Sequence, residues 1–307
     1  MRLCATISGI MTEQYIGRFA PSPTGLLHAG SLVAALASFI DAKAHNGLWL
    51  IRIEDVDTTR CKTEFSQGIL SVLDELQMKS DEPIIFQSER QDRYTEVLNQ
   101  LIASHRVYGC SCSRHSIEEA NRQSGAPLHR YPGNCRGGTA KPIRSWRFLT
   151  DSNPISFVDR WCGPYSQNVE EAVGDFVLKR SDGLFAYQLA VIVDDHDSGI
   201  TDIVRGADLI DNTPRQIAVY RALGWKEPRY MHIPLVLNDR HEKLSKQGGA
   251  RPLSSDLLLE LQHAWMHLGF PAINAKNFED FYGKAVVMWR NRFVSSTFQK
   301  QVHKYPS

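Results

Sequence analysis

Residues that could bind a charged ligand lie at or just past the ends of predicted strands in this 307-residue chain. They are Arg18, Ser22, His28, Gly30 and Glu54. Ligands of open α/β sheets bind beyond the carboxyl ends of the strands, which is where we expect these residues to lie. A helix that begins near His28 would direct its N-terminal amides and the positive end of its dipole at an anion. Taken alone, a Pro/Gly turn followed by a histidine is usually just a turn.

Three of the six cysteines, Cys110, Cys112 and Cys135, lie within one short stretch of the sequence. The others are scattered, which is a poor disulfide framework. A structural zinc ion takes four ligands, usually Cys or His, so the three thiolates predict a metal cluster. Chemistry alone makes His129 the fourth ligand, with His115 as the second choice. The alternative is three unrelated buried thiols.

The elements that must position these residues begin with a strand–helix–strand pattern. A strand over Tyr15–Ala20 precedes a helix, and an apolar strand over Leu48–Ile53 follows it. The helix should end at Gly47 and bury one apolar face, formed by Leu32, Val33, Leu36, Phe39 and Ile40. This order is a βαβ unit, which builds parallel sheets.

Strand and helix patterns continue to alternate along the chain. We expect helices with apolar faces over 65–76, 94–102 and 257–268, and strands over 201–204 and 230–237. Ser88 with Gln91, and Thr213 with Pro214 and Gln216, read as helix N-caps. Residues 108–139 show no period, and 239–251 form a polar loop that contains Lys243 and Lys246. By itself such a loop is more often a solvated surface than a phosphate site.

The composition is that of an ordinary globular protein, with 42% hydrophobic and 22% charged residues. A formal net charge of +1 neither requires nor excludes a nucleic-acid partner, because a local basic patch suffices. No apolar run approaches the ~20 residues of a membrane-spanning helix, and the first ten residues lack the apolar core of a signal peptide. We therefore expect a cytoplasmic protein, acting as a monomer and without a membrane partner, whose translation starts at Met1 or Met11.

Two motifs resemble the signature regions of glutamyl- and glutaminyl-tRNA synthetases, which are class I aminoacyl-tRNA synthetases. The segment 18–31, RFAPSPTGLLHAGS, resembles their HIGH region, and 243–247, KLSKQ, resembles their KMSKS loop. The match is closest to the short, zinc-bearing glutamyl-Q tRNA(Asp) synthetase family, and it extends to 52–55, 185–190, 194–196 and 203–209. Ser31 replaces the last residue of the HIGH element, and Gln247 replaces the last residue of KMSKS.

The resemblance implies a Rossmann-like, doubly wound α/β fold with an inserted zinc-binding subdomain and a short helical C-terminal extension. Residues 1–107 would form the first half of the catalytic domain, and 108–139 the zinc-binding part of the insertion. Residues 140–252 would complete the insertion and the catalytic domain, and 253–307 would form the extension.

Roles for individual residues follow from the same resemblance. His28 and Lys246 would be catalytic, stabilising the pentavalent phosphate and the leaving pyrophosphate, and ATP would be bound, with Mg²⁺, by His28, Gly30, Lys243 and Lys246. Glutamate would be bound by Arg18, Ser22, Glu54, Tyr187 and Arg205, since guanidinium binds carboxylates bidentately and a carboxylate suits the ammonium group. The family pattern Cys-x-Cys…Tyr-x3-Cys makes Tyr131 the fourth zinc ligand, in place of His129.

The implied function is ATP-dependent activation of L-glutamate and its transfer to the queuosine base in the anticodon of tRNA(Asp). We expect this acceptor because about 55 residues follow Pro252, too few for the anticodon-binding domain of a translating synthetase. One rival is a truncated glutamyl-tRNA synthetase that charges a tRNA 3′ end, and another is a ligase with a small-molecule acceptor. A catalytically silent tRNA-binding paralogue is disfavoured because His28, Glu54, Arg205 and Lys246 are all present.

Overall fold

The computed structural model describes residues 3–4, 12–236 and 253–295 of the chain. Its first strand–helix–strand unit forms as the sequence predicts. Strands β3 (Ile16–Phe19) and β4 (Leu48–Ile53) pair in parallel, with Ile16 opposite Leu48, and helix α1 (Ala29–Ala44) connects them. Both strands are almost continuously buried because helices cover both faces of a parallel sheet.

The rest of the central sheet places a ligand-binding crevice between β3 and β11 (Asp202–Gly206). Strand β5 (Ile85–Phe86) adds to β4, and β12 (Arg229–Ile233) adds to β11, both in parallel. The Thr201 N–H donates to the Ile16 carbonyl at 2.9 Å, which sets β11 beside β3. The strand order is β5-β4-β3-β11-β12. From β3 the chain adds strands toward one edge of the sheet, and from β11 it adds them toward the other edge. Ligands of doubly wound sheets bind at such a switch point.

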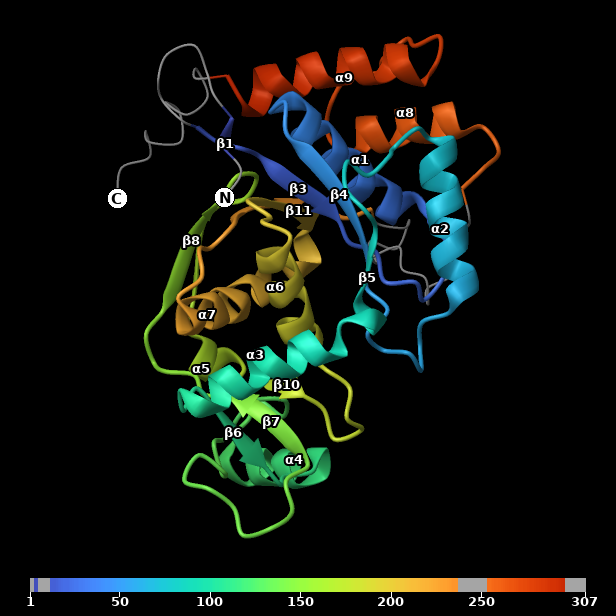
Figure 1. The fold of residues 1–307 in the computed structure, drawn as a ribbon. Helices are drawn as coiled ribbons and strands as arrows, with labels where there is room; N and C mark the ends of the chain where they lie inside the picture. The colour runs from blue at the N-terminus through green and yellow to red at the C-terminus, as the bar shows by residue number, and fades with distance from the viewer. Residues whose placement is uncertain (1–2, 5–11, 237–252, 296–307) are drawn as a thin grey trace, which may run out of the picture.

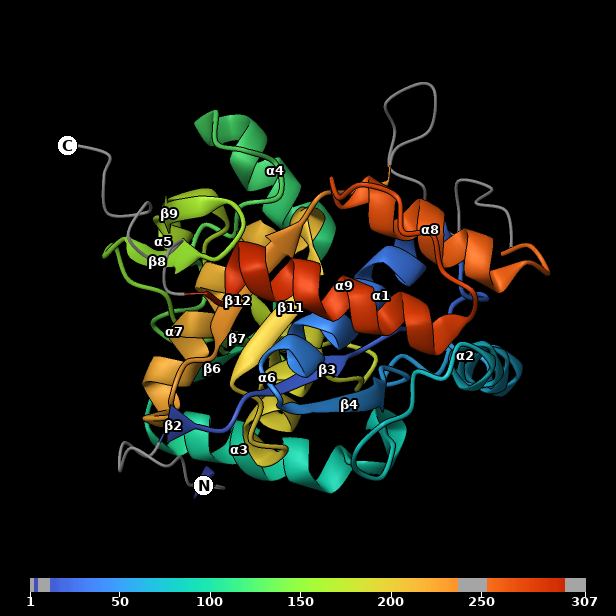
Figure 2. The same ribbon diagram turned by 90° about the horizontal axis from the view of Figure 1, so that it is seen from above.

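Helices cover both faces of this sheet, which confirms the Rossmann-like α/β class (Figure 2). On one face lies α1 with the helices of the C-terminal region, α8 (Leu257–His267) and α9 (Phe278–Phe293), while α2 (Thr63–Glu75) packs at the side. The other face carries α3 (Gln91–Ala103), α6 (Tyr187–Asp197) and α7 (Thr213–Leu223). Trp265 and Trp289 are fully buried against α1, so the C-terminal helices complete the core.

A smaller antiparallel unit is inserted between the halves of the core and extends away from it (Figure 1). Its sheet has the order β10-β7-β6, from β6 (Val107–Cys110), β7 (Ser145–Phe148) and β10 (Val177–Lys179). A hairpin of β8 (Ile155–Asp159) and β9 (Gly163–Gln167), followed by α5 (Val169–Ala172), lies against β12. The shorter elements are β1 (Leu3–Cys4), β2 (Thr12–Glu13), η1 (Gln87–Glu89) and η2 (Ala207–Asn212). The division of the chain at residues 107, 139 and 252 stays a prediction.

The sequence predicted where helices occur more accurately than where they begin and end. Ser88 does not cap α3, because both its N–H and its hydroxyl donate to Asp55 at 2.8 Å. Thr213 is the first residue of α7 rather than its cap, and its hydroxyl accepts from Arg205. Helix α1 ends at Ala44, and Asn46, with φ 53°, makes the turn. Gly47 is needed for a close approach instead, because a Cβ there would lie 2.4 Å from the Tyr15 carbonyl oxygen.

The stretch 108–139, in which we predicted no period, contains helix α4 (Arg114–Ser124). Ser113 caps it by accepting from the Ser116 N–H at 3.1 Å, and Gly125 ends it with φ 72°. These are ordinary start and stop signals, but the helix buries little apolar surface and so has a weak hydrophobic pattern. No helix in the described part of the chain is long and apolar enough to cross a membrane.

Candidate active site and metal site

A cavity of about 610 Å³ opens at the carboxyl ends of β3, β4, β11 and β12. Its lining includes every predicted site residue of the core that the structure describes: Arg18, Ser22, His28, Gly30, Glu54, Tyr187 and Arg205. Lys243 and Lys246 lie outside the described residues. Residues far apart in sequence thus meet at the switch point of the sheet, as the strand order requires.

The N-terminus of α1 faces this cavity. His28 is the N-cap, with extended backbone (φ −134°, ψ 171°), and Gly30 lies in the first turn. The Ser31 hydroxyl accepts from the His28 N–H and donates to the His28 carbonyl, both at 2.8 Å. Ser31, which departs from the HIGH pattern, therefore fixes the start of the helix. The remaining N-terminal amides and the helix dipole favour an anion here.

Arg18 is held at the floor of the cavity by a buried carboxylate. Its Nε and Nη2 donate to Asp195 on α6 at 3.0 and 3.3 Å. Arg52 donates to the same carboxylate at 2.6 Å and to Glu54 at 3.1 Å. Burial would raise the pKa of Asp195, but Arg18 and Arg52 outweigh it and hold that pKa below its ordinary value. The network fixes one guanidinium and one carboxylate at the cavity wall.

Glu54 provides a buried negative charge at the cavity wall. It directly follows β4 and is 7% exposed, and burial raises its pKa even though Arg52 and Arg18 act in the opposite direction. A raised carboxylate pKa means that the charged form gains from a further cation. An ammonium group in the cavity is the partner that this carboxylate favours.

Arg205, on β11, provides a second guanidinium on the opposite side of the switch point. Its Nη1 donates to the Tyr187 hydroxyl at 3.3 Å, and its Nη2 donates to Thr213 at 2.8 Å. Tyr187 is the first residue of α6, so the helix that carries Asp195 also carries the partner of Arg205. The cavity can therefore hold a molecule with two carboxylates and one ammonium, beside an anion at the α1 N-terminus.

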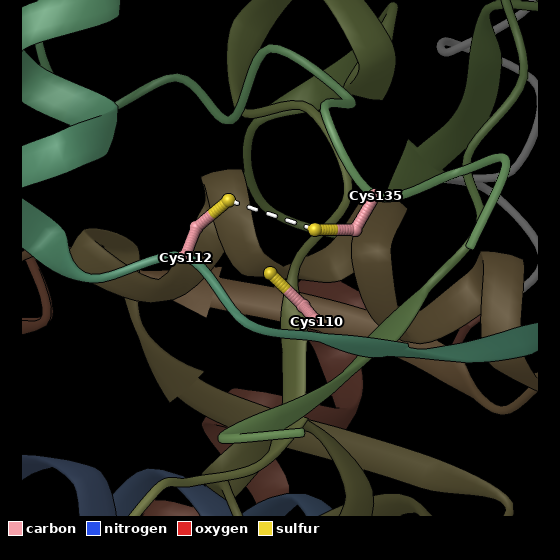
Figure 3. A group of neighbouring side chains, drawn as sticks. All are labelled: Cys110, Cys112 and Cys135. Carbon is pink, nitrogen blue, oxygen red and sulfur yellow. Dashed lines mark hydrogen bonds between the residues drawn. The ribbon is translucent and has the colours of Figure 1, made fainter. Parts of the chain in front are cut away.

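The insertion contains a separate cluster of thiols. The sulfur atoms of Cys110, Cys112 and Cys135 lie within 4.8 Å of one another and point toward a common centre (Figure 3). The Tyr131 hydroxyl joins them, 3.3 Å from Cys110 Sγ and 3.8 Å from Cys112 Sγ. His129 is exposed and does not belong to the cluster, and neither does His115. The structure thus brings together the set that includes Tyr131.

The spacing of these atoms fits a tetrahedral ion. With Zn–S bonds of about 2.3 Å and a Zn–O bond of about 2.0 Å, ligand atoms would stand roughly 3.5–3.8 Å apart. Cys112 Sγ and Cys135 Sγ are separated by 3.6 Å, and the oxygen–sulfur distances bracket the expected value. Burial raises the pKa of the Tyr131 phenol, so its ionised form needs a cation. The Arg147 guanidinium, 3.8 Å from the ring centre, adds positive charge there.

Comparison with known proteins gives the family. A sequence profile described as "tRNA synthetases class I (E and Q), catalytic domain" matches residues 15–261. A relative from Janthinobacterium sp. (strain Marseille) is 48% identical over 92% of this chain and 99% of its own length, and one from Cupriavidus metallidurans is 51% identical over 84% and 86%. Both are named glutamyl-Q tRNA(Asp) synthetase. The chain belongs to this family. It is therefore a ligase of the aminoacyl-tRNA synthetase type.

Solved structures agree with the family assignment. A glutamate tRNA ligase from Elizabethkingia meningosepticum, in complex with its amino acid, superposes with a TM-score of 0.66 at 27% identity. The glutamate–tRNA synthetase of Elizabethkingia anophelis gives 0.67 at the same identity. The match covers 86% of this chain but 55% of either ligase, so the chain spans about half the length of those enzymes. Class I synthetases use ATP.

Some residues at the site of this glutamyl-Q tRNA(Asp) synthetase family member had no predicted role. Asp195 was part of a resembling segment, but its pairing with Arg18 spans 177 positions and leaves no local pattern. Arg60 and Asp208 also line the cavity. Asp208 follows the strand that bears Arg205, so its place after a strand end is the signal that could have found it.

Proposed function

We propose that the enzyme activates L-glutamate with ATP and transfers the glutamyl group to the queuosine base in the anticodon of tRNA(Asp). One observation carries the first half of this proposal. The cavity is lined by two fixed guanidinium groups, Arg18 on β3 and Arg205 on β11, and by the buried carboxylate of Glu54 at the end of β4. This charge pattern is the complement of glutamate, which has two carboxylates and one ammonium.

The bonds of the two arginines support this assignment. Arg18 donates to Asp195 through Nε and Nη2. Within the described part of the chain this leaves Nη1 to donate to a substrate carboxylate. Arg205 directs Nη1 toward Tyr187 at the cavity wall. Hydrogen bonds to charged groups contribute about 1.5–3 kcal/mol each, so two such anchors favour a dicarboxylate over an amino acid with one carboxylate. Ser22, which lines the same wall, completes the proposed glutamate site.

In the activation step a carboxylate oxygen of glutamate attacks the α-phosphorus of ATP. A new C–O–P linkage forms, the bond to the β-phosphate breaks, and pyrophosphate leaves, giving glutamyl adenylate. Two anions must meet, so the protein contributes positioning and positive charge. His28, Gly30 and the α1 N-terminus supply this on one side of the cavity, and Lys243 and Lys246, which lie outside the described residues, would supply the rest, with Mg²⁺ carried by ATP.

The transfer step needs a nucleophilic hydroxyl on the acceptor. A hydroxyl of queuosine attacks the glutamyl carbonyl, AMP leaves, and an ester forms. Support for this acceptor comes from the relatives, which are named for it and which the chain matches over 99% and 86% of their length. We further propose that the enzyme acts as a cytoplasmic monomer.

We also propose that Cys110, Cys112, Tyr131 and Cys135 hold one structural zinc ion. In such a site the protein fills all four coordination positions of the ion, so the ion contributes to the free energy of folding and not to catalysis. Here it would join the end of β6 to the segment that carries Tyr131 and Cys135. The insertion would then present a rigid surface to RNA.

The decisive experiment uses radiolabelled glutamate with tRNA(Asp) that does or does not contain queuosine, followed by nuclease mapping. We expect label in the anticodon nucleotide of queuosine-containing tRNA alone. Label at the 3′-terminal adenosine would identify a truncated glutamyl-tRNA synthetase. No incorporation, together with no glutamate-dependent exchange of pyrophosphate into ATP, would identify a silent paralogue.

A further inference from the structure

Behind Arg205 lies a group of buried polar side chains outside the cavity lining. His232 on β12 is fully buried, Asp159 at the end of β8 is 2% exposed, and Thr213 at the start of α7 is fully buried. We propose that Asp159 and His232 are positioning residues, which set the tautomer of one imidazole so that Arg205 presents a fixed N–H to the substrate carboxylate. This inference rests on the proposed role of Arg205 in glutamate binding.

The donors of Arg205 are nearly all assigned. Nε donates to His232 Nε2 at 3.0 Å, and Nη2 donates to Thr213 Oγ1 at 2.8 Å and to the Leu209 carbonyl at 3.5 Å. Nη1 donates to the Tyr187 hydroxyl at 3.3 Å. A guanidinium has five N–H groups, so one N–H on Nη1 is left by these contacts of the described residues. The bond to Nε fixes the plane of the guanidinium and thus the direction of that last donor.

The hydrogen bond from Arg205 Nε–H indicates which ring nitrogen of His232 carries the proton. Nε2 must accept from Arg205, so the proton lies on Nδ1, where it is donated to Asp159 Oδ2 at 2.6 Å. Burial, with the help of Arg205, lowers the pKa of His232 despite the nearby Asp159 carboxylate, which agrees with a neutral ring. The Thr213 hydroxyl lies 3.2 Å from Nε2 and accepts from Arg205 Nη2. It can donate to the one lone pair of Nε2, which it then shares with the Arg205 Nε–H.

Asp159 is itself held in one orientation. Its Oδ1 accepts from the backbone N–H groups of Trp161 and Cys162 at 2.9 and 2.8 Å, and the His232 N–H lies 3.1 Å from both Oδ1 and Oδ2. Two backbone donors thus hold Oδ1, a third is shared by both oxygens, and Oδ2 faces the imidazole. The β8–β9 hairpin, which belongs to the insertion, therefore reaches the amino-acid site of the core through one carboxylate and one ring.

This geometry makes Asp159→Asn an informative substitution. The asparagine oxygen must take the Oδ1 position, because the Trp161 and Cys162 N–H groups point at it, so the amide nitrogen takes the Oδ2 position. That nitrogen donates to His232 Nδ1, which moves the ring proton to Nε2. The His232 Nε2–H then faces the Arg205 Nε–H. Two donors that face each other repel, so the guanidinium must turn away from its present orientation. The size of the side chain and its bonds to the hairpin backbone are retained.

The test measures glutamate-dependent exchange of pyrophosphate into ATP by the full-length protein. We expect Asp159→Asn to raise the KM for glutamate by about 10- to 100-fold, which corresponds to one hydrogen bond to a charged group. The KM for ATP should stay within about twofold. Asp151→Asn, the same change at an exposed position before the hairpin, is the matched control and should leave both constants unchanged. Thr213→Val should raise the glutamate KM as well, while Thr213→Ser should not.

Two further readouts separate positioning from a structural role. Ring ¹⁵N chemical shifts should show His232 protonated on Nδ1 in the wild type and on Nε2 in Asp159→Asn. In an Arg205→Ala background, Asp159→Asn should add less than about twofold to the glutamate KM, because its effect passes through Arg205. A full additional effect there, or an unchanged tautomer and KM in the single variant, would overturn the inference. Failure of Arg205→Ala itself to affect glutamate would instead refute the proposed substrate site.

Discussion

Asp195→Asn is the substitution for which the structure gives the most direct expectation. Asp195 is almost fully buried and accepts from both Arg18 and Arg52, so its charge compensates two guanidinium groups that are themselves almost fully buried. Removing one partner of a buried ion pair typically costs about 3–5 kcal/mol, because the other charge is left without compensation. Since about 1 kcal/mol shifts the melting temperature of a protein of this size by roughly 2–3 °C, we expect a decrease of about 6–15 °C.

The control for this prediction is Asp182→Asn. Asp182 makes the same type of pair, with Arg180 at 2.6 Å, but its side chain is 46% exposed. Exposed pairs contribute about 0–1 kcal/mol, so this variant should melt within about 2 °C of the wild type. Both proteins should be assayed by thermal melting and by glutamate-dependent pyrophosphate exchange, where Asp195→Asn should also raise the glutamate KM through Arg18.

The pH dependence of the difference gives a second test of the same reasoning. The pKa of Asp195 is lower in the folded protein than its ordinary value, so its contribution to stability is fully present above the unfolded pKa of about 3.9. It is lost as the pH falls through the folded pKa. The gap in melting temperature between wild type and Asp195→Asn should therefore be constant above about pH 5 and shrink below about pH 4. Equal melting of Asp195→Asn and Asp182→Asn at neutral pH would refute the reasoning.

Two other predictions concern catalysis and metal. Pyrophosphate exchange with glutamate should proceed without tRNA, because the cavity is built by the core alone; exchange that starts only after tRNA is added would show that the site is incomplete. Metal analysis of purified protein should find one zinc per chain, lost in Cys110→Ser with destabilisation of 108–136, since the binding free energy of such a site is also folding free energy. Tyr131→Phe should weaken zinc binding and His129→Ala should not; the reverse result would exchange the two residues as ligands.

The sequence predicted the elements of the core because their patterns are local and strong. The apolar strands around Arg18 and Glu54 and the amphipathic helix after His28 are each contained in a few consecutive residues. The helix caps were wrong where a side chain found a distant partner. Ser88 bonds to Asp55 and Thr213 bonds to Arg205, so neither hydroxyl serves the helix next to it.

The site residues that could be predicted are those that belong to sequence motifs. Residues that line the cavity occur in short segments that resemble a known family, so their positions could be read directly. The side chains that hold them could not be read in this way. Asp195 lies 177 positions from Arg18, and Asp159 lies 73 positions from His232, so these pairs exist only through the fold. Packing of the inserted hairpin against β12 has no counterpart in any local pattern.

The proposed enzyme attaches glutamate to the anticodon and not to the acceptor end. An enzyme that charges the 3′ end esterifies a ribose hydroxyl of the terminal adenosine, so removal of the CCA end abolishes its reaction. The direct measurement compares glutamate incorporation into tRNA(Asp) that lacks its 3′ CCA but contains queuosine with incorporation into complete tRNA(Asp) that carries guanine in place of queuosine. The proposed function predicts that the first RNA accepts glutamate and the second does not. Charging of the second RNA and not of the first would contradict it.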